Sequence, residues 1–484
     1  MSVIDNLEPK LVWKHFDEIR KIPRCSKHEE KIREYIVDFA KKQNLDHKVD
    51  KTGNVVIVKP ATSGMENKTT VILQGHMDMV CEKNSDVDFD FSKDAINIKL
   101  KTDDILTADG TTLGADNGIG IAMTLAILED KELKHGKLEG LFTVDEETGL
   151  TGAFALEKDM LTGKILLNLD SEDFGVLTVG CAGGGDTQIE LPVVKKPVNG
   201  DMQTIMIKIS GLKGGHSGVD IHEQRGNAVK ILSRMLWKAS IEHEFYISEI
   251  KGGDKHNAIP REAYATIAVG KSNKDGLVKV LESEKKSITD EIKPIDPGLK
   301  LNIEATSDVK TTLDKNAQKK LLNLLHGLPH GVDKMSYDIP DLVDTSTNLA
   351  TVDLKNEKAY IQLSTRSSMS SALQDLRDRI NAVAELSGAK VEEGEPYPGW
   401  KPDLKSDILK VSKRIFKDMY GKEPTVEAIH AGLECGIIGE KFPGMDMISI
   451  GPTVKYPHSP DEELHISTVG KTYDYVLKIL EEIE

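Results

Sequence analysis

Residues 71–80 read VILQGHMDMV, and this stretch decides the fold. Val71–Gln74 is short and dense in apolar residues, which is typical of a strand buried on both faces of a parallel sheet. His76 and Asp78 follow directly after it. Because ligands of open α/β sheets bind beyond the carboxyl ends of the strands, the stretch predicts a strand that delivers polar side chains to a site.

The same rhythm of short apolar runs and helical periodicity extends to both sides of this stretch. In the N-terminal part we predict strands at Asn54–Val58, Leu141–Val144 and Ile165–Leu169 and a helix at Gly118–Asp130. The C-terminal part predicts helices at Ser406–Tyr420, Leu433–Glu440 and from Thr468, and strands at Thr425–Ile429 and Met445–Ile450. This alternation predicts an α/β fold with a mostly parallel sheet and flanking helices.

A helix start is predicted near the N-terminus. Residues 26–29 read SKHE, which is a capping-box pattern, and Ile32, Ile36, Phe39 and Ala40 then recur at helical spacing.

The chain divides into three blocks, 1–184, 185–396 and 397–484. Glycine and proline clusters at 183–185 and 394–399 mark the two boundaries. The middle block alternates strand-like and helical segments in a different order, with predicted strands at Thr204–Ile209, Ala263–Val269 and Tyr360–Ser364, and predicted helices at Gln224–Lys238, Asp275–Glu291, Asn316–Leu325 and Ala372–Leu386. The sequence therefore predicts an α+β domain inserted into a discontinuous α/β domain.

Composition excludes some broad classes. The 484 residues are 39% hydrophobic and 29% charged, with a net charge of −16, so large cores are expected and a basic nucleic-acid footprint is not. Neither a membrane-spanning run nor a signal-peptide core is seen in the sequence. The four cysteines are widely spaced without a C-x-x-C pair, which predicts reduced thiols and a cytoplasmic protein.

Polar side chains follow the predicted strand ends at His76, Asp116, Glu147, Asp170 and His458. Imidazoles and carboxylates are ligands for zinc, or for manganese or cobalt in its place. One ion that keeps a position open for water cannot use all five, whereas two ions about 3.5–4 Å apart and bridged by a carboxylate can. We predict Asp116 as the bridge, with His76 and Asp170 on one ion and Glu147 and His458 on the other.

Each of these residues also has a purely structural interpretation. His76 and Asp78 could be a satisfied pair, Glu146 and Glu147 a solvated turn, and Asp116 an N-terminal helix carboxylate favoured by the dipole. Their joint position at one edge of the sheet favours the metal site.

The remaining acids suggest hydrolytic chemistry. Asp78 is predicted to accept the remote N–H of His76 and so orient the ring. Glu146 adjoins Glu147 and, if this segment is extended, points the opposite way, toward the metal-bound water. There it is predicted to be the general base for that water, whose pKa the metal brings toward about 7, and later the acid for the leaving amine.

Four motifs identify the chain as similar to a known family. Residues 75–80 (GHMDMV), 112–118 (TLGADNG), 145–149 (DEETG) and His458 resemble the aminoacylase/carnosinase/carboxypeptidase G group of di-zinc exopeptidases, over nearly the whole chain. Residues 168–172 (NLDSE) and 430–436 (HAGLECG) are most similar to the branch of this group that hydrolyses dipeptides, including Xaa-His dipeptides. The resemblance implies a catalytic domain with an inserted lid, the ligands given above with Asp78 and Glu146 catalytic, and a cis peptide after Asp116.

Further candidate site residues lie in or near the lid, and residues 213–218 resemble the lid motif of the family. His216, within residues 213–218 (KGGHSG), would donate to the tetrahedral oxyanion, and Asn257 would bind the substrate. Arg366 would clamp the terminal carboxylate of the peptide, Gly432 would offer a backbone N–H, and Glu434 would bind the ammonium group. The alternatives are a surface loop, a turn asparagine, an exposed strand-end arginine and an ordinary residue in the first turn of a helix.

The leading hypothesis is a cytoplasmic dipeptidase with two divalent cations, most simply Zn²⁺, that acts on small unblocked peptides. The alternatives are a tripeptide aminopeptidase or an N-acyl amino-acid deacylase of the same family, and a metal-binding scaffold without turnover. The resemblance leaves open a homodimer through the lid, with His216 serving its own or a partner's site.

Overall fold

The computed structural model describes residues 3–198 and 200–484. The chain divides into two compact units. Unit 1 comprises the chain up to Cys181 together with Trp400–Ala428 and Leu433–Glu484, and unit 2 comprises Ala182–Gly399 with Ile429–Gly432. Residues 429–432, which the sequence placed in the last block, belong to unit 2.

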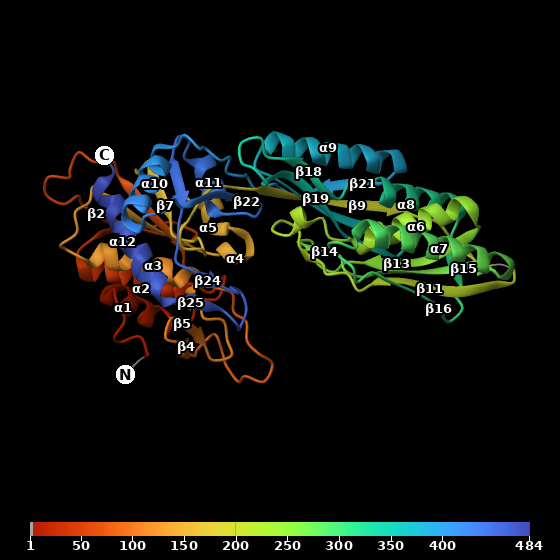
Figure 1. Cartoon of the computed structure of the whole chain (residues 1–484), viewed down its shortest axis with the longest axis horizontal. Coiled ribbons are helices and arrows are strands. Elements are labelled where there is room, and N and C mark those ends of the chain that lie inside the picture. Colours follow the sequence, from red (N-terminus) through yellow and green to blue (C-terminus); the bar gives the residue numbers. More distant parts are fainter. Residues whose placement is uncertain (1–2, 199) are drawn as a thin grey trace. The chain divides into compact units, whose positions relative to one another are not determined.

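Unit 1 is built on a large sheet, drawn in red to yellow and blue in Figure 1. Its strands follow the order β1-β2-β6-β3-β7-β23-β8-β22. β6, β3, β7 and β23 run parallel to one another, whereas β1, β2 and β8 are antiparallel to their neighbours. The strands are β1 (Asp46–Val49), β2 (Val55–Lys59), β3 (Val71–His76), β6 (Leu138–Thr143), β7 (Ile165–Asn168), β8 (Val176–Cys181), β22 (Thr425–Ile429) and β23 (Asp446–Ser449). The predicted α/β class with a mostly parallel sheet is confirmed.

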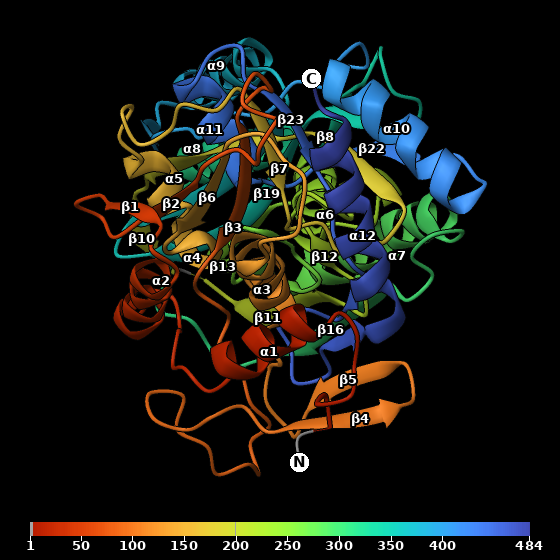
Figure 2. The ribbon, with the colours of Figure 1, turned by 90° about the vertical axis from the view of Figure 1, so that its left-hand side faces the viewer.

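Helices cover both faces of this sheet. α3 packs on β3 and β6 and contacts α1 and α12, and α10 packs on β23, as Figure 2 shows from the side of unit 1. α5 and α11 contact each other, and their buried residues share a core cluster with one face of the sheet. The helices are α1 (Lys10–Ile19), α2 (Glu30–Gln43), α3 (Ala115–Glu129), α4 (Glu146–Gly149), α5 (Thr151–Ala155), α10 (Asp407–Tyr420), α11 (Glu434–Lys441) and α12 (Ile466–Glu482).

The strand sequences explain the two-sided packing. In β3, every residue from Val71 to His76 is buried. Ile72, Leu141 and Leu166 point into the cluster with α5 and α11, while their strand neighbours face the opposite layer because side chains alternate along a strand. Burying each such side chain contributes about 1.5–3 kcal/mol, so the sheet is fixed in register by both layers.

A smaller antiparallel sheet in unit 1 joins the C-terminal part of the chain to residues near 100. Its order is β24-β25-β5-β4, and β25 pairs with β5. The strands are β4 (Ile98–Thr102), β5 (Ile105–Ala108), β24 (Val454–Lys455) and β25 (Glu463–His465).

Unit 2 is an α+β structure around an antiparallel sheet. The strand order is β16-β11-β15-β13-β19-β20-β9-β21, with β18 beside β19. Short pairs β10–β17 and β12–β14 lie outside this sheet. The strands are β9 (Gly183–Pro192), β10 (Lys195–Pro197), β11 (Met202–Ser210), β12 (Gly215–His216), β13 (Phe245–Gly252), β14 (Ala258–Ile259), β15 (Ala263–Gly270), β16 (Lys300–Ala305), β17 (Thr311–Leu313), β18 (Gly331–Met335), β19 (Val343–Lys355), β20 (Lys358–Ser367) and β21 (Lys390–Glu393).

The helices of unit 2 pack on this sheet through a continuous apolar core. Two of them have side-chain N-caps, because Asn227 accepts the N–H of Lys230 and Asp314 accepts that of Ala317. The helices are α6 (Ala228–Glu242), α7 (Lys271–Ile292), α8 (Lys315–Gly327), α9 (Ser370–Ser387) and the 3₁₀ helix Ile221–Glu223.

Two of the four cysteines form a disulfide, so the expectation of four reduced thiols is wrong. Cys25 and Cys81 are linked at a Cα separation of 5.7 Å although they are 56 residues apart. The chain before α2 runs beside the segment after β3, where Cys25 forms a parallel bridge with Met79, and this pairing brings the two thiols together. Cys181 and Cys435 are free and buried.

The capping box predicted for α2 is not formed. Its N-cap is Glu29, and within the described part of the chain no side chain caps it. Ser26 Oγ instead donates to Asp78 at 2.8 Å, and the Glu29 carboxylate accepts the N–H groups of Lys27 and Asp145. These residues therefore hold the loops after β3 and β6 rather than the helix end.

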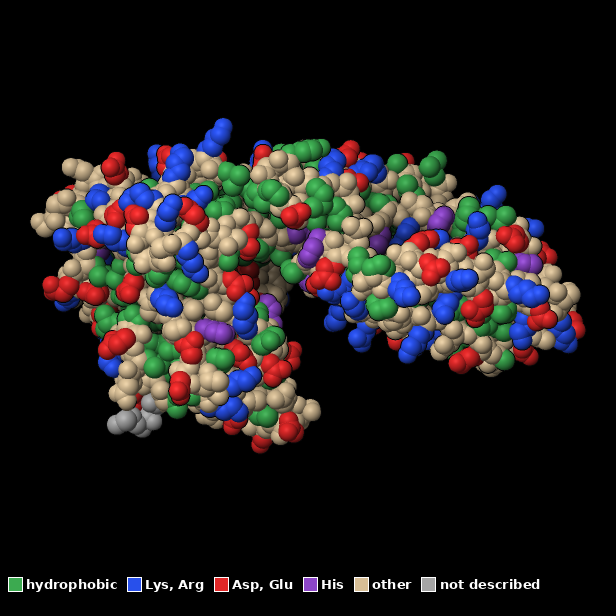
Figure 3. Space-filling model, viewed as in Figure 1, with side chains coloured by type: hydrophobic (Ala, Val, Ile, Leu, Met, Phe, Trp, Pro, Cys, Tyr) green, Lys and Arg blue, Asp and Glu red, His purple; other side chains and the backbone are tan. Residues whose placement is uncertain are grey.

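On the face drawn in Figure 3, acidic and basic side chains are interspersed over both units. Within residues 3–198 and 200–484, none of the helices combines the length and apolarity that a membrane crossing requires.

Candidate metal centre

The five strand-end residues singled out from the sequence all lie in unit 1. His76 ends β3, Asp116 lies in the first turn of α3, and Asp170 follows β7. Glu147 lies in α4, directly after β6, and His458 lies between β24 and β25. Because β3, β6 and β7 are parallel neighbours, their carboxyl ends present His76, Glu147 and Asp170 at one edge of the sheet.

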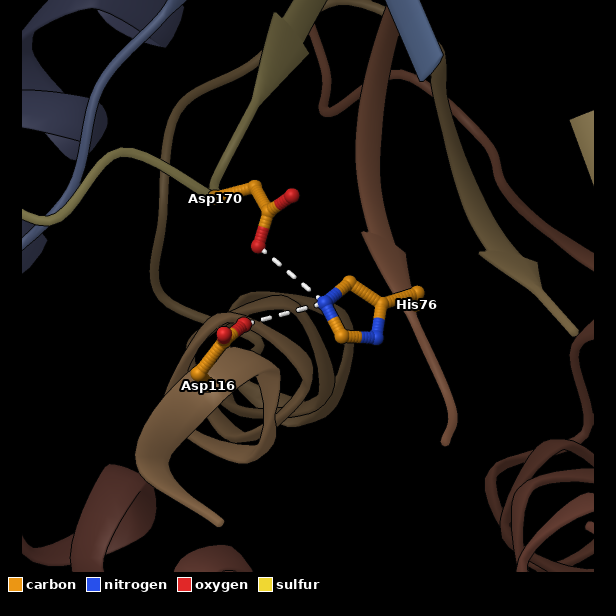
Figure 4. Close-up of side chains that lie close together, drawn as sticks. All are labelled: His76, Asp116 and Asp170. Carbon is orange, nitrogen blue, oxygen red and sulfur yellow. Dashed lines mark hydrogen bonds and ion pairs between the residues drawn. The ribbon is translucent and has the colours of Figure 1, made fainter. Parts of the chain in front are cut away.

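The first group is formed by His76, Asp116 and Asp170, which point toward one another in Figure 4. Nε2 of His76 lies 3.0 Å from Asp116 Oδ1 and 3.3 Å from Asp170 Oδ1. The peptide bond between Asp116 and Asn117 is cis, as the family resemblance implied.

The second group is formed by Asp116, Glu147 and His458. Nε2 of His458 lies 3.0 Å from Asp116 Oδ2 and 3.0 Å from Glu147 Oε2. Asp116 therefore turns one carboxylate oxygen toward each group, which is the arrangement of a bridging ligand.

Asp78 is fully buried beside His76. Its Oδ1 lies 3.3 Å from Nδ1 of His76, on the ring edge opposite the first group. It also accepts the N–H groups of Glu146 and Glu147 and the hydroxyl of Ser26. Burial alone would raise the pKa of Asp78, but the His76 imidazole and these donors lower it to about 2. A charged Asp78 thus pairs with the His76 ring and binds the backbone at the start of α4.

Glu146 and Glu147 do not lie in an extended segment, so that part of the prediction is wrong. Asp145 has a left-handed conformation with φ of 50°, and Glu146 and Glu147 begin the one-turn helix α4. Successive helical residues point about 100° apart, so the two carboxylates still diverge. Glu147 pairs with His458, while Glu146 lies within reach of His76.

The donor set fits divalent cations. Asp78, Asp116, Glu146, Glu147 and Asp170 outnumber the two imidazoles of the site. Burial raises the pKa of Asp170 to about 6, since the repulsion from Asp116 and Glu147 adds to it and the attraction of His76 only partly offsets it. Oε1 of Glu147 is buried and finds no hydrogen-bond donor among the described residues. A cluster with this excess of buried negative charge requires positive charge, which imidazole with carboxylate oxygens can hold as zinc or a similar ion.

A network of hydrogen bonds between buried side chains lies beneath the site. It includes Gln74 and Asn168, which stand two residues before His76 and Asp170. Asn168 Nδ2 donates to Gln74 Oε1 at 2.6 Å, and Ser449 Oγ donates to Asn168 Oδ1 at 2.5 Å. At the other end, Gln74 Nε2 and Thr143 Oγ1 donate to Glu434 Oε2 at 2.6 and 2.7 Å. The network ties β6, β3, β7 and β23 together directly beneath His76 and Asp170.

Glu434 is 0% exposed, so it is not an ordinary surface residue of a first helical turn. Burial raises its pKa to about 7, partly offset by the Thr143 hydroxyl. Its Oε1 has no hydrogen-bond partner within the described residues.

His216, Asn257, Arg366 and Gly432 belong to unit 2. Nδ1 of His216 accepts the N–H groups of Gly218 and Val219, at 3.2 and 3.0 Å. Burial and then the charge of Arg366 lower the pKa of His216 to about 4. At neutral pH the ring therefore carries its single proton on Nε2, where it can be donated.

Arg366 is not an exposed strand-end arginine. It lies in β20, is 7% exposed, and donates from Nη1 to the Tyr397 hydroxyl at 3.0 Å. Asn257 is exposed, and its carbonyl accepts the N–H of Ser217 next to His216. Gly432 ends the short segment that the C-terminal part of the chain contributes to unit 2.

Sequence reasoning missed Ser26, Arg24 and Glu462. Ser26 was assigned to a helix cap, and Arg24 carried no motif. Glu462 stands four residues after His458 in an acidic run, DEE, that is typical of a solvated loop. No local signal separates the buried Glu462 from the exposed Asp461 beside it.

Residues 72–482 match the profile of Peptidase family M20/M25/M40. The chain is 40% identical to the cytosol non-specific dipeptidase of Escherichia coli (strain K12) over 483 residues, which is 100% of this chain and 99% of that protein. The structure of aminoacylhistidine dipeptidase from Vibrio alginolyticus is 42% identical, covers 100% of this chain and 98% of that chain, and superposes with a TM-score of 0.93. The aminopeptidase PepT of Bacillus cereus ATCC 10987 superposes with a TM-score of 0.56 at 18% identity over 99% of each chain, a likeness of fold alone.

Proposed function

This chain belongs to peptidase family M20/M25/M40, and we propose that it hydrolyses unblocked dipeptides, including Xaa-His dipeptides, at the centre around Asp116. As a metallo-dipeptidase of this family it acts on small peptides, which agrees with the names of the relatives that match its full length. The main structural support for the proposal is the geometry around Asp116. One of its oxygens faces His76 and Asp170, and the other faces His458, which also pairs with Glu147.

The residues proposed to hold two divalent cations are His76, Asp116 and Asp170 for one ion and Asp116, Glu147 and His458 for the other. Zn²⁺ is the proposed occupant because imidazole and carboxylate oxygen suit it, with Mn²⁺ or Co²⁺ as substitutes. Bound there, such a pair would polarise a peptide carbonyl and lower the pKa of a water molecule.

Glu146 is the proposed general base and acid. Burial raises the pKa of Glu146 well above its usual value; the charge of His76 lowers this pKa, and the charges of Asp170 and Glu434 raise it further. In this role its carboxylate takes a proton from the attacking water and then delivers it to the nitrogen of the departing amine. Asp78 acts through His76 by holding the imidazole ring from its far edge.

Unit 2 is proposed to supply substrate contacts. His216, with its proton on Nε2, would donate to the oxygen that becomes charged as the carbonyl is attacked. The buried guanidinium of Arg366 would pair with the peptide carboxylate in a fork. Asn257 and Gly432 would complete the contacts from unit 2, and Glu434 of unit 1 would offer Oε1 to the substrate ammonium.

The experiment combines a substrate panel with a matched pair of variants. Free dipeptides, tripeptides and N-acetyl amino acids are assayed before and after chelation, and cleavage of free dipeptides that is lost on chelation is expected. A preference for tripeptides or N-acetylated substrates would replace the dipeptide assignment with a tripeptidase or deacylase.

Glu146→Gln is expected to lower kcat at least about 10²-fold because the proton acceptor is lost, while metal content stays unchanged. Glu132→Gln, on an exposed glutamate of the same unit, is the control that retains wild-type kcat. Unchanged turnover in Glu146→Gln would discard the proposed mechanism. Zero turnover of every substrate by the metal-loaded wild type would favour the scaffold alternative.

The cytoplasm is the proposed location, on the strength of the name of the Escherichia coli relative. A homodimer through unit 2 is the proposed assembly, and sedimentation of the purified protein tests it by mass.

A further inference from the structure

One carboxylate holds the whole turn that ends on Asp116. Oε2 of Glu462 accepts the N–H groups of Leu113 and Gly114 at 2.7 and 2.9 Å. Oε1 accepts those of Ala115 and Asp116 at 2.8 and 3.2 Å. Four consecutive amides thus converge on a side chain that is 2% exposed. Hydrogen bonds from N–H groups to a carboxylate are about twice as strong as neutral ones, so this backbone is firmly fixed.

A buried guanidinium holds the same turn from its carbonyl side. Arg24 donates to the carbonyl of Gly114, and also to those of Met77 and Asp78 at 3.1 and 2.7 Å. Arg24 is 2% exposed, so its charge faces protein groups rather than water. It therefore joins the turn before Asp116 to the loop after β3, which carries Asp78.

Through its position in the chain, Glu462 links the loop that carries His458 to the turn before Asp116. Glu462 lies four residues after His458, in the loop that leads into β25. By binding the amide of Asp116 it sets the distance between two segments that are about 340 residues apart in sequence, and His458 Nε2 and Asp116 Oδ2 meet at 3.0 Å. A shift of either segment by about 1 Å would separate His458 from Asp116 too far for both to bind one ion, because metal ligands must be held within about 0.5 Å of their working positions.

We propose that Glu462 is a positioning residue that places the bridging carboxylate of Asp116 against His458, with Arg24 aligning the same turn to Asp78. The role rests on the proposed metal centre. Neither side chain is a proposed ligand of the cations: Glu462 is occupied by backbone N–H groups and Arg24 by backbone carbonyls.

Glu462→Gln tests the proposal with the least change of shape. The amide retains one acceptor oxygen but turns an NH₂ group toward two N–H donors, so at least two of the four hydrogen bonds are lost. Titration of the chelated protein with Zn²⁺ alone is expected to show a 10- to 100-fold loss of affinity for at least one of the two equivalents, as for other residues that orient ligands. The titration is made at a temperature where circular dichroism shows the variant fully folded.

The matched control is Glu463→Gln. Glu463 is the adjacent glutamate, and its carboxylate pairs with Lys101 instead of binding the turn. The Glu463→Gln variant should bind both equivalents of Zn²⁺ with wild-type affinity. Glu462→Asp, which keeps the charge, should recover part of the lost affinity, and it replaces the glutamine variant if that one does not fold. Arg24→Lys retains charge but not the fork, and should also weaken binding.

Unchanged affinity for both equivalents in folded Glu462→Gln would overturn the proposal, as would an equal loss in Glu463→Gln. The titration uses no peptide, so failure of the dipeptidase assignment would appear only in the substrate panel and is distinguishable from failure of the positioning role.

Discussion

The two histidines of the proposed metal centre and two histidines of unit 2, His216 and His430, lie in opposite electrostatic environments. Although burial opposes it, Asp170, Asp116 and Asp78 raise the pKa of His76 well above its usual value, and the Asp116 and Glu147 carboxylates raise that of His458 to about 11. In unit 2, burial followed by the charge of Arg366 lowers the pKa of His216 to about 4 and of His430 to about 3. The carboxylates around the first two imidazoles attract positive charge, whether a proton or a cation, whereas the imidazoles of His216 and His430 remain neutral hydrogen-bonding groups at neutral pH.

His430 should make unit 2 sensitive to acid. Its pKa is about 3 in the folded protein against a usual 6.5, so between these values the unfolded state binds more protons and stability falls as the pH drops below 6.5. From pH 7 to pH 5 the loss is about 2 kcal/mol for this group. The free energy of unfolding is measured with denaturant at pH 7 and pH 5. Its decrease between the two pH values is expected to be about 2 kcal/mol smaller in His430→Asn than in the wild type. The exposed His222→Asn should behave as wild type, and an equal loss in all three proteins would contradict the prediction.

At the level of elements, the segment before α2 is cross-linked to the segment after β3 next to the site. Arg24 binds the carbonyls of Met77 and Asp78, the next residue forms the Cys25–Cys81 disulfide, and Ser26 binds the Asp78 carboxylate. The loop that carries Asp78 is therefore held by three successive residues, Arg24, Cys25 and Ser26, which lie outside the named helices and strands.

Breaking the disulfide should lower the stability of unit 1. A cross-link that closes a loop of 56 residues contributes about 4 kcal/mol by restricting the unfolded chain. Reductant, or the double change Cys25→Ser and Cys81→Ser, is expected to lower the Tm of the oxidised protein measured by calorimetry. Reductant added to the double variant is the control and should have no further effect. An unchanged Tm of the wild type on reduction would contradict the prediction.

For the molecule as a whole, the proposed metal centre concentrates buried charge in one unit. The predicted ligands all come from unit 1, and they are drawn from both its N-terminal and its C-terminal parts. Cations bound there would link these parts, so metal binding would contribute to the stability of the folded state as well as to chemistry.

Metal removal should therefore lower the unfolding temperature. Free Zn²⁺ at about 100 times its Kd stabilises the folded state by about 2.7 kcal/mol, which for a unit of this size is roughly 5–10 °C in Tm. Calorimetry of chelated and Zn²⁺-loaded protein measures the difference. Asp116→Asn should lose most of the metal-dependent rise, and an equal rise in that variant would contradict the assignment of Asp116 as the bridge.

The fold was predictable because its signals are local. Strand β22 was predicted at Thr425–Ile429 and observed there, and α10 and β3 differ from prediction by one or two residues at an end. The buried apolar runs of a parallel sheet, and the helices between them, are visible in any window of about ten residues. The grouping of His76, Glu147 and Asp170 followed from the same signals, because parallel strands end at a common edge. Asp116 lies at the start of α3 and His458 lies between β24 and β25, so the edge alone does not account for their place in the group.

The sequence by itself determined the parallel α/β framework and the polar residues at its strand ends. Only the tertiary structure decided that Cys25 forms a disulfide with Cys81 and that Ser26 donates to Asp78 instead of capping a helix. It also decided that the Glu462 carboxylate accepts the N–H groups of the turn before Asp116. These choices depend on contacts between segments far apart in the chain. A cysteine, serine or glutamate has the same local pattern whether it is solvated or buried, and burial against a distant partner is what gives it a role.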